Sequence, residues 1–221
     1  MNPVVRKLIA KELYLYRWLI AVTVFSGLVC LGVSCLGRIS FGIGSIMFLT
    51  VVVAYGCVLP MFSITSDRKE KSVVFVLSLP ISRADYRRSK MAGVLLSFLI
   101  PWCVLLAAAV VVIKASLIPD GMILLTVLLM GLVLTNFCLI VSVLMVTASE
   151  TFTILLILCT NVSVTFFIVG LTNLTSIGPA SARQTLVWDT AALTVLGCEA
   201  AAIVVLTFIS VWTSGREPDI V

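Results

Sequence analysis

The sequence contains no histidine, and only ten of its 221 residues are aspartate or glutamate. Without histidine, the chain lacks the commonest general base and the commonest nitrogen ligand for metals. It also lacks a GxxxxGK[ST] phosphate-binding loop, the usual means of holding a nucleotide. No two carboxylates fall where the expected helices would bring them to the same depth. We therefore expect no catalytic, metal-binding or cofactor-binding site on this chain.

The seven cysteines give no sign of a metal site or a disulfide framework. Each lies inside an apolar run, and none shows the spacing of metal ligands: Cys30, Cys35, Cys57, Cys103, Cys138, Cys159 and Cys198. Cysteine in such surroundings behaves as a small, polarizable packing residue.

What the sequence has in abundance is apolar side chains. They make up 61% of the chain, charged residues make up 11%, and the mean hydropathy is +1.23. Runs near the length of about 20 residues that crosses a bilayer recur along the whole chain. We predict an all-α integral membrane protein, one transmembrane domain over 1–221, with spans near 17–37, 43–64, 91–113, 122–146, 152–172 and 189–213.

The distribution of lysine and arginine predicts the orientation. With six spans, both termini share one side with the loops after the second and fourth spans. That side receives twelve of the fifteen basic residues, and the other side receives only Arg38, Lys114 and Arg183. Basic residues concentrate on the cytosolic side. We expect a multi-pass protein of the inner or plasma membrane with both termini cytosolic. Membrane orientation explains the net charge of +5 without a nucleic-acid partner.

Residues 1–16 have the pattern of an amphipathic helix before the first span. At 100° per residue, the apolar face comprises Val5, Leu8, Ile9, Leu13 and Tyr16, and the other face comprises Arg6, Lys7, Ala10, Lys11 and Tyr14. This pattern is typical of a helix lying in the membrane interface. Glu12 falls within the apolar face, so its carboxylate should be paired with a nearby basic residue or face a protein surface.

The loop 65–90 contains seven of the fifteen basic residues. Its apolar run Val73–Leu79 is too short to span a membrane, and Pro80 ends it because proline disfavours helix at the preceding residue. Ser82 has the residue type of a helix N-cap, and Asp85 adds an acid to the following first turn. We expect a cytosolic helical elbow between spans two and three that transmits force into both. The alternative is a basic loop that only fixes the orientation.

Three features resemble the membrane subunits of ABC-2-type transporters. They are KEL at Lys11–Leu13 with Arg17 ahead of the first span, a charged loop after the second span, and LSLPISRADYRRSK at Leu77–Lys90. The last is similar to an LPxSR…K element that, in the family, belongs to the cytosolic region docking on the ATPase. The resemblance covers nearly the whole chain in topology. It implies a homo- or heterodimer whose two subunits enclose a pathway.

By this resemblance, ATP and Mg are held by a separate cytosolic ATPase subunit. The residues that would couple its movement to the membrane are Lys11, Glu12, Asp67, Glu70, Pro80, Arg83, Asp85, Arg87, Arg88 and Lys90. The family's loop carries an acid shortly before a Gly-Thr or similar pair, whereas this chain reads Asp67-Arg-Lys-Glu70-Lys-Ser72. Asp67 and Glu70 are therefore both candidates for the docking acid.

Few polar residues lie inside the spans. Asn136 and Asn161 are candidates either for bonds across helices or for lining a pathway. Glu199 is the one acid well within an apolar run. It is either a pathway-lining group or a protonated or hydrogen-bonded residue near the outer end of its span. The outer loop 173–188, broken at Gly178–Pro179, is either a plain connector or, as the resemblance implies, a re-entrant gate.

These observations predict a permease subunit of an ATP-driven exporter for a hydrophobic or amphipathic substrate such as a peptide, lipid or drug. One alternative is the permease of a haem-type or other small-molecule exporter. Another is a membrane scaffold whose basic loop recruits a soluble partner without transport. An intramembrane enzyme is the third, and the absence of a reactive constellation argues against it.

Overall fold

The computed structural model describes residues 3–65, 83–116, 118–147, 150–174, 177–181, 185 and 188–213. Within these ranges the chain forms helices and short connections, with no strand. Six helices are long and apolar enough to cross a membrane: α1 Pro3–Ser34, α2 Arg38–Pro60, α5 Arg83–Ala115, α6 Met122–Val146, α7 Glu150–Asn173 and α9 Thr190–Thr213. The predicted all-α fold with six spans is confirmed.

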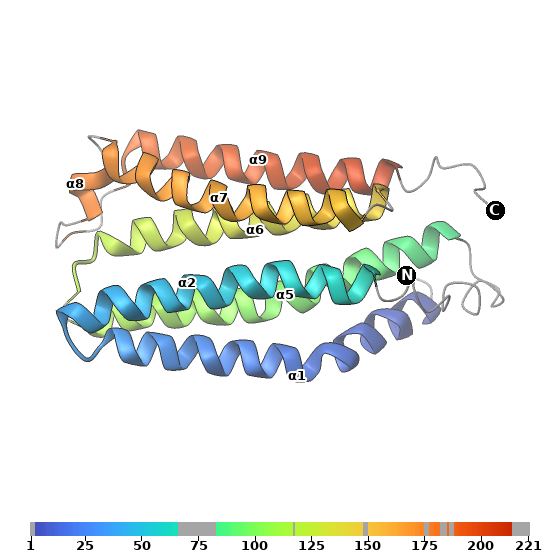
Figure 1. The fold of residues 1–221 in the computed structure, drawn as a ribbon, viewed down its shortest axis with the longest axis horizontal. Coiled ribbons are helices and arrows are strands. Elements are labelled where there is room, and N and C mark those ends of the chain that lie inside the picture. The colour runs from blue at the N-terminus through green and yellow to red at the C-terminus, as the bar shows by residue number, and fades with distance from the viewer. Residues whose placement is uncertain are drawn as a thin grey trace.

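The helices run alternately up and down one bundle (Figure 1). The start of α1, the end of α2, the start of α5 and the end of α9 meet at one end, called here the terminal end. The short helix α8, Ile177–Ser181, lies at the opposite end between α7 and α9. Residues that are far apart in sequence, such as those near Glu12 and Lys90, therefore lie at the same end of the bundle.

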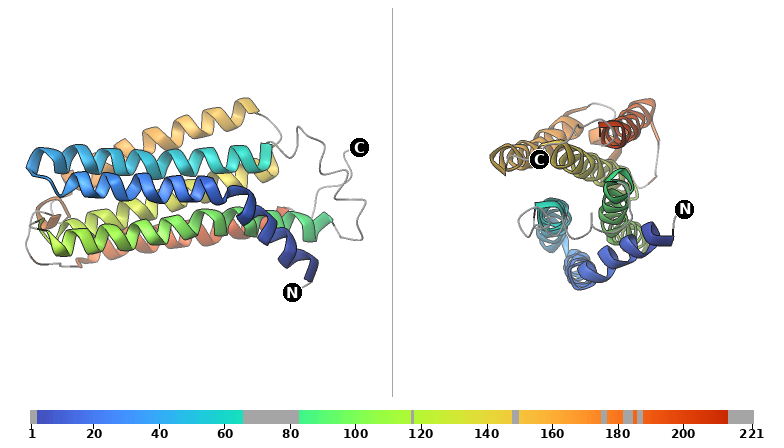
Figure 2. Two further views of the ribbon diagram at one scale, coloured as in Figure 1. Left: turned by 90° about the horizontal axis from the view of Figure 1, so that it is seen from below. Right: turned by 90° about the vertical axis from the view of Figure 1, so that its right-hand side faces the viewer.

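The bundle consists of two halves. α1, α2 and α5 pack against one another, and α6 packs against both α7 and α9. The halves lie side by side in Figures 1 and 2, and α6 contacts both α2 and α5. α6 is thus the helix that joins the second half to the first.

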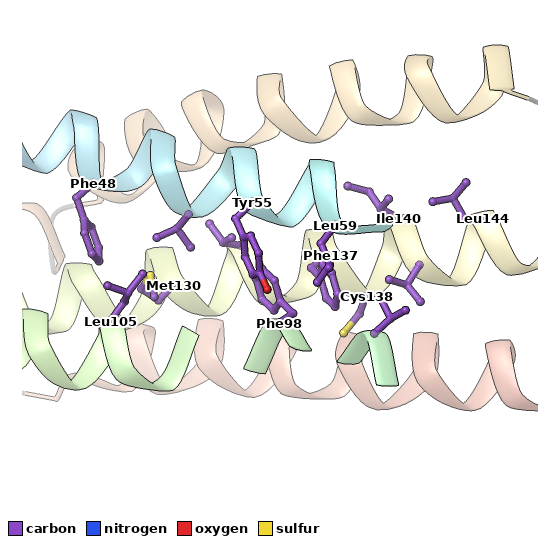
Figure 3. Packing of buried hydrophobic residues seen from close by; sticks show 14 of the residues in the cluster. Phe48, Tyr55, Leu59, Phe98, Leu105, Met130, Phe137, Cys138, Ile140 and Leu144 are labelled. Atoms are coloured by element: carbon purple, nitrogen blue, oxygen red, sulfur yellow. The ribbon is translucent and has the colours of Figure 1, made fainter. Parts of the chain in front are cut away.

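An aromatic stack fills the junction between the halves (Figure 3). The ring of Phe98 in α5 lies 3.9 Å from that of Phe137 in α6 and 5.7 Å from that of Tyr55 in α2, centroid to centroid, with all three rings nearly parallel. The Tyr55 hydroxyl donates to the backbone oxygen of Ser97 at 2.6 Å. Buried aromatic rings contribute both apolar area and ring–ring attraction, and all three residues belong to the main buried cluster of the bundle.

The predicted interface helix is not a separate element. α1 continues without interruption from Pro3 through the expected boundary near residue 16, and bends on the way, as Figures 1 and 2 show. The reason is local, because no glycine or proline occurs between Val4 and Ser26 to end the helix. The predicted elbow lies mostly in 66–82, outside the described residues, and only its second helix, the start of α5 at Arg83, is described.

The hairpin of α1 and α2 depends on two glycines. Gly37, in the short connection, has φ of 154°, a conformation that favours glycine. Gly44 of α2 lies against α1 so closely that an added methyl group would be 2.7 Å from the backbone oxygen of Cys30 and 2.7 Å from the backbone nitrogen of Ser34. Close backbone approach of this kind is how membrane helices gain packing contacts.

A short π-helix, η1 Met61–Thr65, continues α2 at the terminal end. It follows Pro60, which has no backbone N–H to donate and therefore cannot maintain the regular α-helical ladder. A π-helical turn changes the direction in which the following side chains point, and such turns are frequent at functional sites. Here the turn carries Ser63, which is fully buried.

Candidate functional site

Glu12 is buried in the terminal half of the bundle, with only 6% of its surface exposed. Its neighbours on the other face of α1, including Lys7 and Lys11, are exposed. Leu8, Ile9 and Leu13, on the face predicted to be apolar, are partly buried. The two faces predicted from the sequence therefore differ in exposure as expected, and Glu12 lies on the less exposed face.

Glu12 is paired with Lys90 at the start of α5. The Lys90 Nζ donates to Glu12 Oε1 at 2.8 Å. The pair is buried, because the Glu12 side chain is 8% exposed and the Lys90 side chain is 7% exposed. Ser63 Oγ of η1 donates to the second carboxylate oxygen, Oε2, at 3.2 Å. Both oxygens of the buried carboxylate are thus satisfied, as burial of a charge requires.

Gly93, one turn after Lys90 in α5, allows α1 to approach. A methyl group at this position would lie 2.9 Å from both Cβ and Cγ of Glu12. The absence of a side chain therefore makes room for the carboxylate stem beside the α5 backbone. Glu12, Lys90, Ser63 and Gly93 are together called the α1–α5 site below.

The α1–α5 site joins three elements, α1, η1 and α5, at the terminal end. A buried ion pair is not in itself a large source of stability, because desolvation offsets much of the attraction. Losing one partner is costly, however, because the other charge stays buried. The arrangement therefore fixes how the first part of α1 sits on α5. It contains one acid, one amine and one hydroxyl, with no arrangement for nucleophilic catalysis.

Metal binding finds no support in the part of the chain that the structure describes. No group of three or more Cys, Asp or Glu side chains comes together there. The cysteines are free thiols, six of them on six different helices and Cys35 in the connection between α1 and α2.

The other residues predicted for coupling are placed only in part. Lys11 and Arg88 are exposed at the terminal end. Arg83, Asp85 and Arg87 belong to the first turns of α5, where the backbone alone is described. The remaining predicted residues, Asp67, Glu70 and Pro80, lie outside the described residues.

The sequence interpretation did not identify Ser63 or Gly93. The position of Glu12 on an apolar face was a signal that it needs a partner, and Lys90 was already a candidate through the family resemblance. Ser63 follows an apolar run and Gly93 begins one, and neither residue type is unusual there. Pro60 is the sequence signal that could have predicted a departure from regular helix at the end of the second span.

The two asparagines predicted within the spans have different surroundings. Asn136 of α6 donates to the backbone oxygen of Thr160 at 3.3 Å and to Ser163 Oγ at 3.2 Å, so it links α6 to α7. Asn161 of α7 is exposed and donates to the backbone oxygen of Ile157 at 2.8 Å. It also reaches Cys57 Sγ of α2 at 3.9 Å. Asn136 therefore holds two helices together, whereas Asn161 lies at the surface of the bundle.

Glu199 lies near the middle of its span, not near the outer end. The span extends from Thr190 to Ser210, which makes Ala200 its middle residue. The Glu199 side chain is 7% exposed and packs against Gly131 of α6, where its carboxyl oxygen occupies the place that a side chain at position 131 would need. Neither carboxyl oxygen has a hydrogen-bond partner among the described residues.

The fold and the α1–α5 site together define a class: a multi-pass helical membrane protein without a catalytic constellation in its described part, with a buried ion pair fastening its first helix to its third span. Within that class the chain belongs to the ABC-2 family of transporter proteins, whose family model matches residues 7–216. The family consists of transporter membrane subunits, which generally work with an ATPase partner. Comparison with curated proteins found no match, and neither did comparison with solved structures.

Proposed function

We propose that this chain is the membrane subunit of an ATP-driven exporter, powered by a separate cytosolic ATPase subunit. The observation that carries the proposal is the α1–α5 site. It fastens α1, η1 and α5 to one another at the point where segment 66–82 joins the bundle. A force applied to that segment or to the start of α1 would therefore move the first half of the bundle as one body.

In this proposal the terminal end faces the cytosol, at the plasma or inner membrane. The bias of lysine and arginine toward this end supports the orientation. Arg6, Lys7 and Lys11 are exposed there, and so is Arg88. At the opposite end, the exposed Lys114 is paired with Asp120 at 3.4 Å, so its charge is partly neutralised.

The predicted coupling residues divide into two groups. Lys11 and Arg88 are exposed, which supports direct contact with the ATPase, and Asp67, Glu70, Pro80, Arg83, Asp85 and Arg87 belong to the same proposed docking surface. Glu12 and Lys90 are buried. Their proposed role is therefore to transmit the movement from the docking surface into α1 and α5, without touching the partner.

The proposed substrate is hydrophobic or amphipathic. An open groove of about 870 Å³ runs between α6, α7 and α9, and its lining contains no charged residue. A second cavity of about 250 Å³ lies among α1, α2, α5 and α6, toward the opposite end, and is also lined without charge. Apolar walls of this kind favour apolar ligands and offer no counter-ion to a strongly charged one.

A second permease subunit is part of the proposal, with the pathway between the two. α7 supports this arrangement, because it exposes an amide side chain, Asn161, next to the middle of its span at Val162. Polar groups at this depth normally face other protein or water and avoid lipid. The amide already donates to the backbone oxygen of Ile157 and reaches Cys57 Sγ, and a neighbouring subunit packed on α7 would cover the part of the side chain that is still exposed.

Two sets of substitutions test the function. The docking variant combines Glu70→Ala, Arg83→Ala and Arg87→Ala, and the buried-pair variant combines Glu12→Gln with Lys90→Met. We expect the docking variant to lose co-purification with the cognate ATPase. We expect the buried-pair variant to retain the ATPase but to lose substrate transport, because docking remains while transmission fails.

The matched control removes basic charge from the side predicted to be outer, by Arg38→Ala and Arg183→Ala. It should retain both ATPase binding and transport. Failure of the wild-type chain to capture an ATPase from its own membranes would contradict the exporter proposal. Binding of a soluble partner without any effect of either variant set on ATP hydrolysis would point to the scaffold alternative.

A further inference from the structure

Glu199 presents an unusual combination of burial and isolation. It lies next to the middle of its span, its residue surface is 7% exposed, and neither carboxyl oxygen finds a hydrogen-bond donor among the described residues. Buried polar groups in native proteins almost always have a partner, so an exception requires an explanation. The buried acid Glu12 shows the usual solution, with Lys90 and Ser63 on its two oxygens.

The surroundings of Glu199 provide no opposite charge. It packs on α6, which has no charged side chain along Met122–Val146 and whose one titratable group, Cys138, is a buried thiol. α9 has no other charged residue between Thr190 and Ser210. An ionised carboxylate at this depth without a partner is strongly disfavoured, so the closed arrangement requires the neutral acid.

α5 does not supply a counter-charge either. It meets α9 at Met91, whose Sδ accepts a hydrogen bond from Ser210 Oγ at 3.4 Å. The charged residues of α5 lie at its two ends, between Arg83 and Lys90 and at Lys114. Lys90 is paired with Glu12, and Lys114 is paired with Asp120. Glu199, at mid-depth, is remote along the helix axis from both ends.

Glu199 is buried through its contact with Gly131 of α6, so its burial depends on α9 lying against α6. The carboxyl group lies where a methyl group at position 131 would have to be, so glycine is needed for α9 to sit in its present place on α6. Cys138 and Ser142 lie two and three turns after Gly131, on the same face of α6. There Ser142 Oγ donates to the backbone oxygen of Leu206 in α9 at 3.0 Å. The α6–α9 seam is thus closely packed at Glu199 and, toward the terminal end, at Ser142 and Leu206.

We propose that Glu199 is a proton-binding site, occupied when α6 and α9 are in contact and emptied when the α6–α9 seam opens to water. The neutral acid is compatible with the dry seam, and the carboxylate is stable only where water or a cation can reach it. Because the proton binds much better to the closed arrangement than to the open one, proton binding and seam closure stabilise each other. The inference does not depend on an ATPase partner.

Infrared spectroscopy of the wild-type chain in lipid bilayers near neutral pH tests the proton directly. We expect a carbonyl-stretch band of a protonated carboxylic acid in an apolar environment, lost in Glu199→Gln and retained in Asp189→Asn. Asp189 is the matched acid, since it lies beside the same helix and its Oδ1 accepts from the Thr190 backbone N–H at 2.7 Å. Absence of the band from the wild type would overturn the proposal.

Labelling with dicyclohexylcarbodiimide gives a second readout in native membranes. This apolar reagent reacts with protonated carboxyl groups, and mass spectrometry of the modified peptides locates the product. We expect modification at Glu199 and none at that peptide in Glu199→Gln. A water-soluble carbodiimide should leave Glu199 unmodified. Preferential modification of Glu199 by the water-soluble reagent would show an acid open to solvent and would contradict burial in the seam.

The link to the seam is tested with two glycine variants. Gly131→Ala places a methyl group where the carboxyl lies, so we expect the protonated-acid band to weaken as Glu199 is displaced toward water. Gly197→Ala, two residues from Glu199 with open space around it, is the matched control and should leave the band unchanged. Circular dichroism verifies that both variants are folded. An unchanged band in folded Gly131→Ala would separate the proton from the seam and overturn the coupling.

Discussion

Glu12 and Glu199 are buried acids in surroundings of opposite kinds. Glu12 lies among side chains from three elements and has a lysine on one oxygen and a hydroxyl on the other. Glu199 lies against Gly131 of α6, and neither of its carboxyl oxygens has a hydrogen-bond partner among the described residues. A charge is maintained in the first case because its partners are fixed by the fold, whereas the second environment suits only the neutral acid. The same residue type is therefore a structural tie in one place and a candidate proton site in the other.

Substitution at the α1–α5 site should show the asymmetry of a buried pair. We expect Lys90→Met to destabilise the protein by about 3–5 kcal/mol, because Glu12 would remain buried without its counter-charge. The double variant Glu12→Gln, Lys90→Met should recover most of that loss, since no uncompensated charge remains. Unfolding by denaturing detergent in mixed micelles measures both.

Lys114 offers the matched control for this prediction. It is also a lysine of α5 paired with an acid, Asp120, but its side chain is 55% exposed. Lys114→Met should change the free energy of unfolding by no more than about 1 kcal/mol. Equal losses for Lys90→Met and Lys114→Met, or no recovery in the double variant, would contradict the importance given to burial.

At the scale of the elements, the two ends of α2 contact their neighbours through different structural features. One end approaches α1 through Gly44, and the other departs from α-helical geometry at Pro60 to form η1. The first feature sets the distance between two helices, and the second presents Ser63 to Glu12. α2 therefore contributes to the α1–α5 site without contributing a charged residue.

The approach at Gly44 gives a prediction with a control in the same helix. Gly44→Ala should destabilise the protein by about 1–3 kcal/mol, because the new methyl group meets the α1 backbone at Cys30 and Ser34, which cannot move aside as a side chain would. Gly42→Ala, where the added methyl meets nothing within 4 Å, should be neutral or slightly stabilising. Thermal unfolding of the two variants in the same detergent provides the comparison. A larger loss for Gly42→Ala would contradict the assigned packing.

The elements themselves were predictable from the sequence, because length and hydropathy decide which segments can cross a bilayer. Where one helix ends and the next begins was harder to predict. The amphipathic pattern of residues 1–16 indicates which face is buried but does not say whether the helix stops before the span. The pairing of Glu12 had several possible basic partners. Ser63 and Gly93 could not be identified, since their roles arise from the approach of segments distant in sequence.

At the scale of the whole molecule, the two halves differ in how well they are covered. α7 and α9 are the least buried of the six spans within the described structure, and both belong to the second half. The first half contains the α1–α5 site, whereas the second half carries the open groove and the exposed Asn161. This division agrees with the proposed function, in which the first half receives the movement and the second half meets the substrate and a second subunit.

The exposed flank of α7 leads to a prediction about assembly. With the seven native cysteines replaced by alanine, we expect Asn161→Cys to form a cross-linked dimer in native membranes when a short bifunctional maleimide is added. The physical reason is that a second copy covering α7 would bring two such positions together. Phe25→Cys provides the comparison, because Phe25 is 71% exposed and belongs to α1, which packs with α2 and α5 in the other half of the bundle. Cross-linking at Phe25→Cys but not at Asn161→Cys would place the contact on the first half instead.

The position of Lys90 and Glu12 within one half also bears on biosynthesis. Chains are made and organised from the N-terminus onward, and α1, α2 and α5 are complete once residue Ala115 has been added. Glu12 can therefore pair with Lys90 before any residue of α6 enters the membrane, so its carboxylate does not stay unpaired in the bilayer until a later helix is added. Phe137 then arrives with α6 and stacks on Phe98 of the half already formed. We therefore expect the nascent chain to pair Glu12 with Lys90 before α6, α7 and α9, the helices that line the groove, are added.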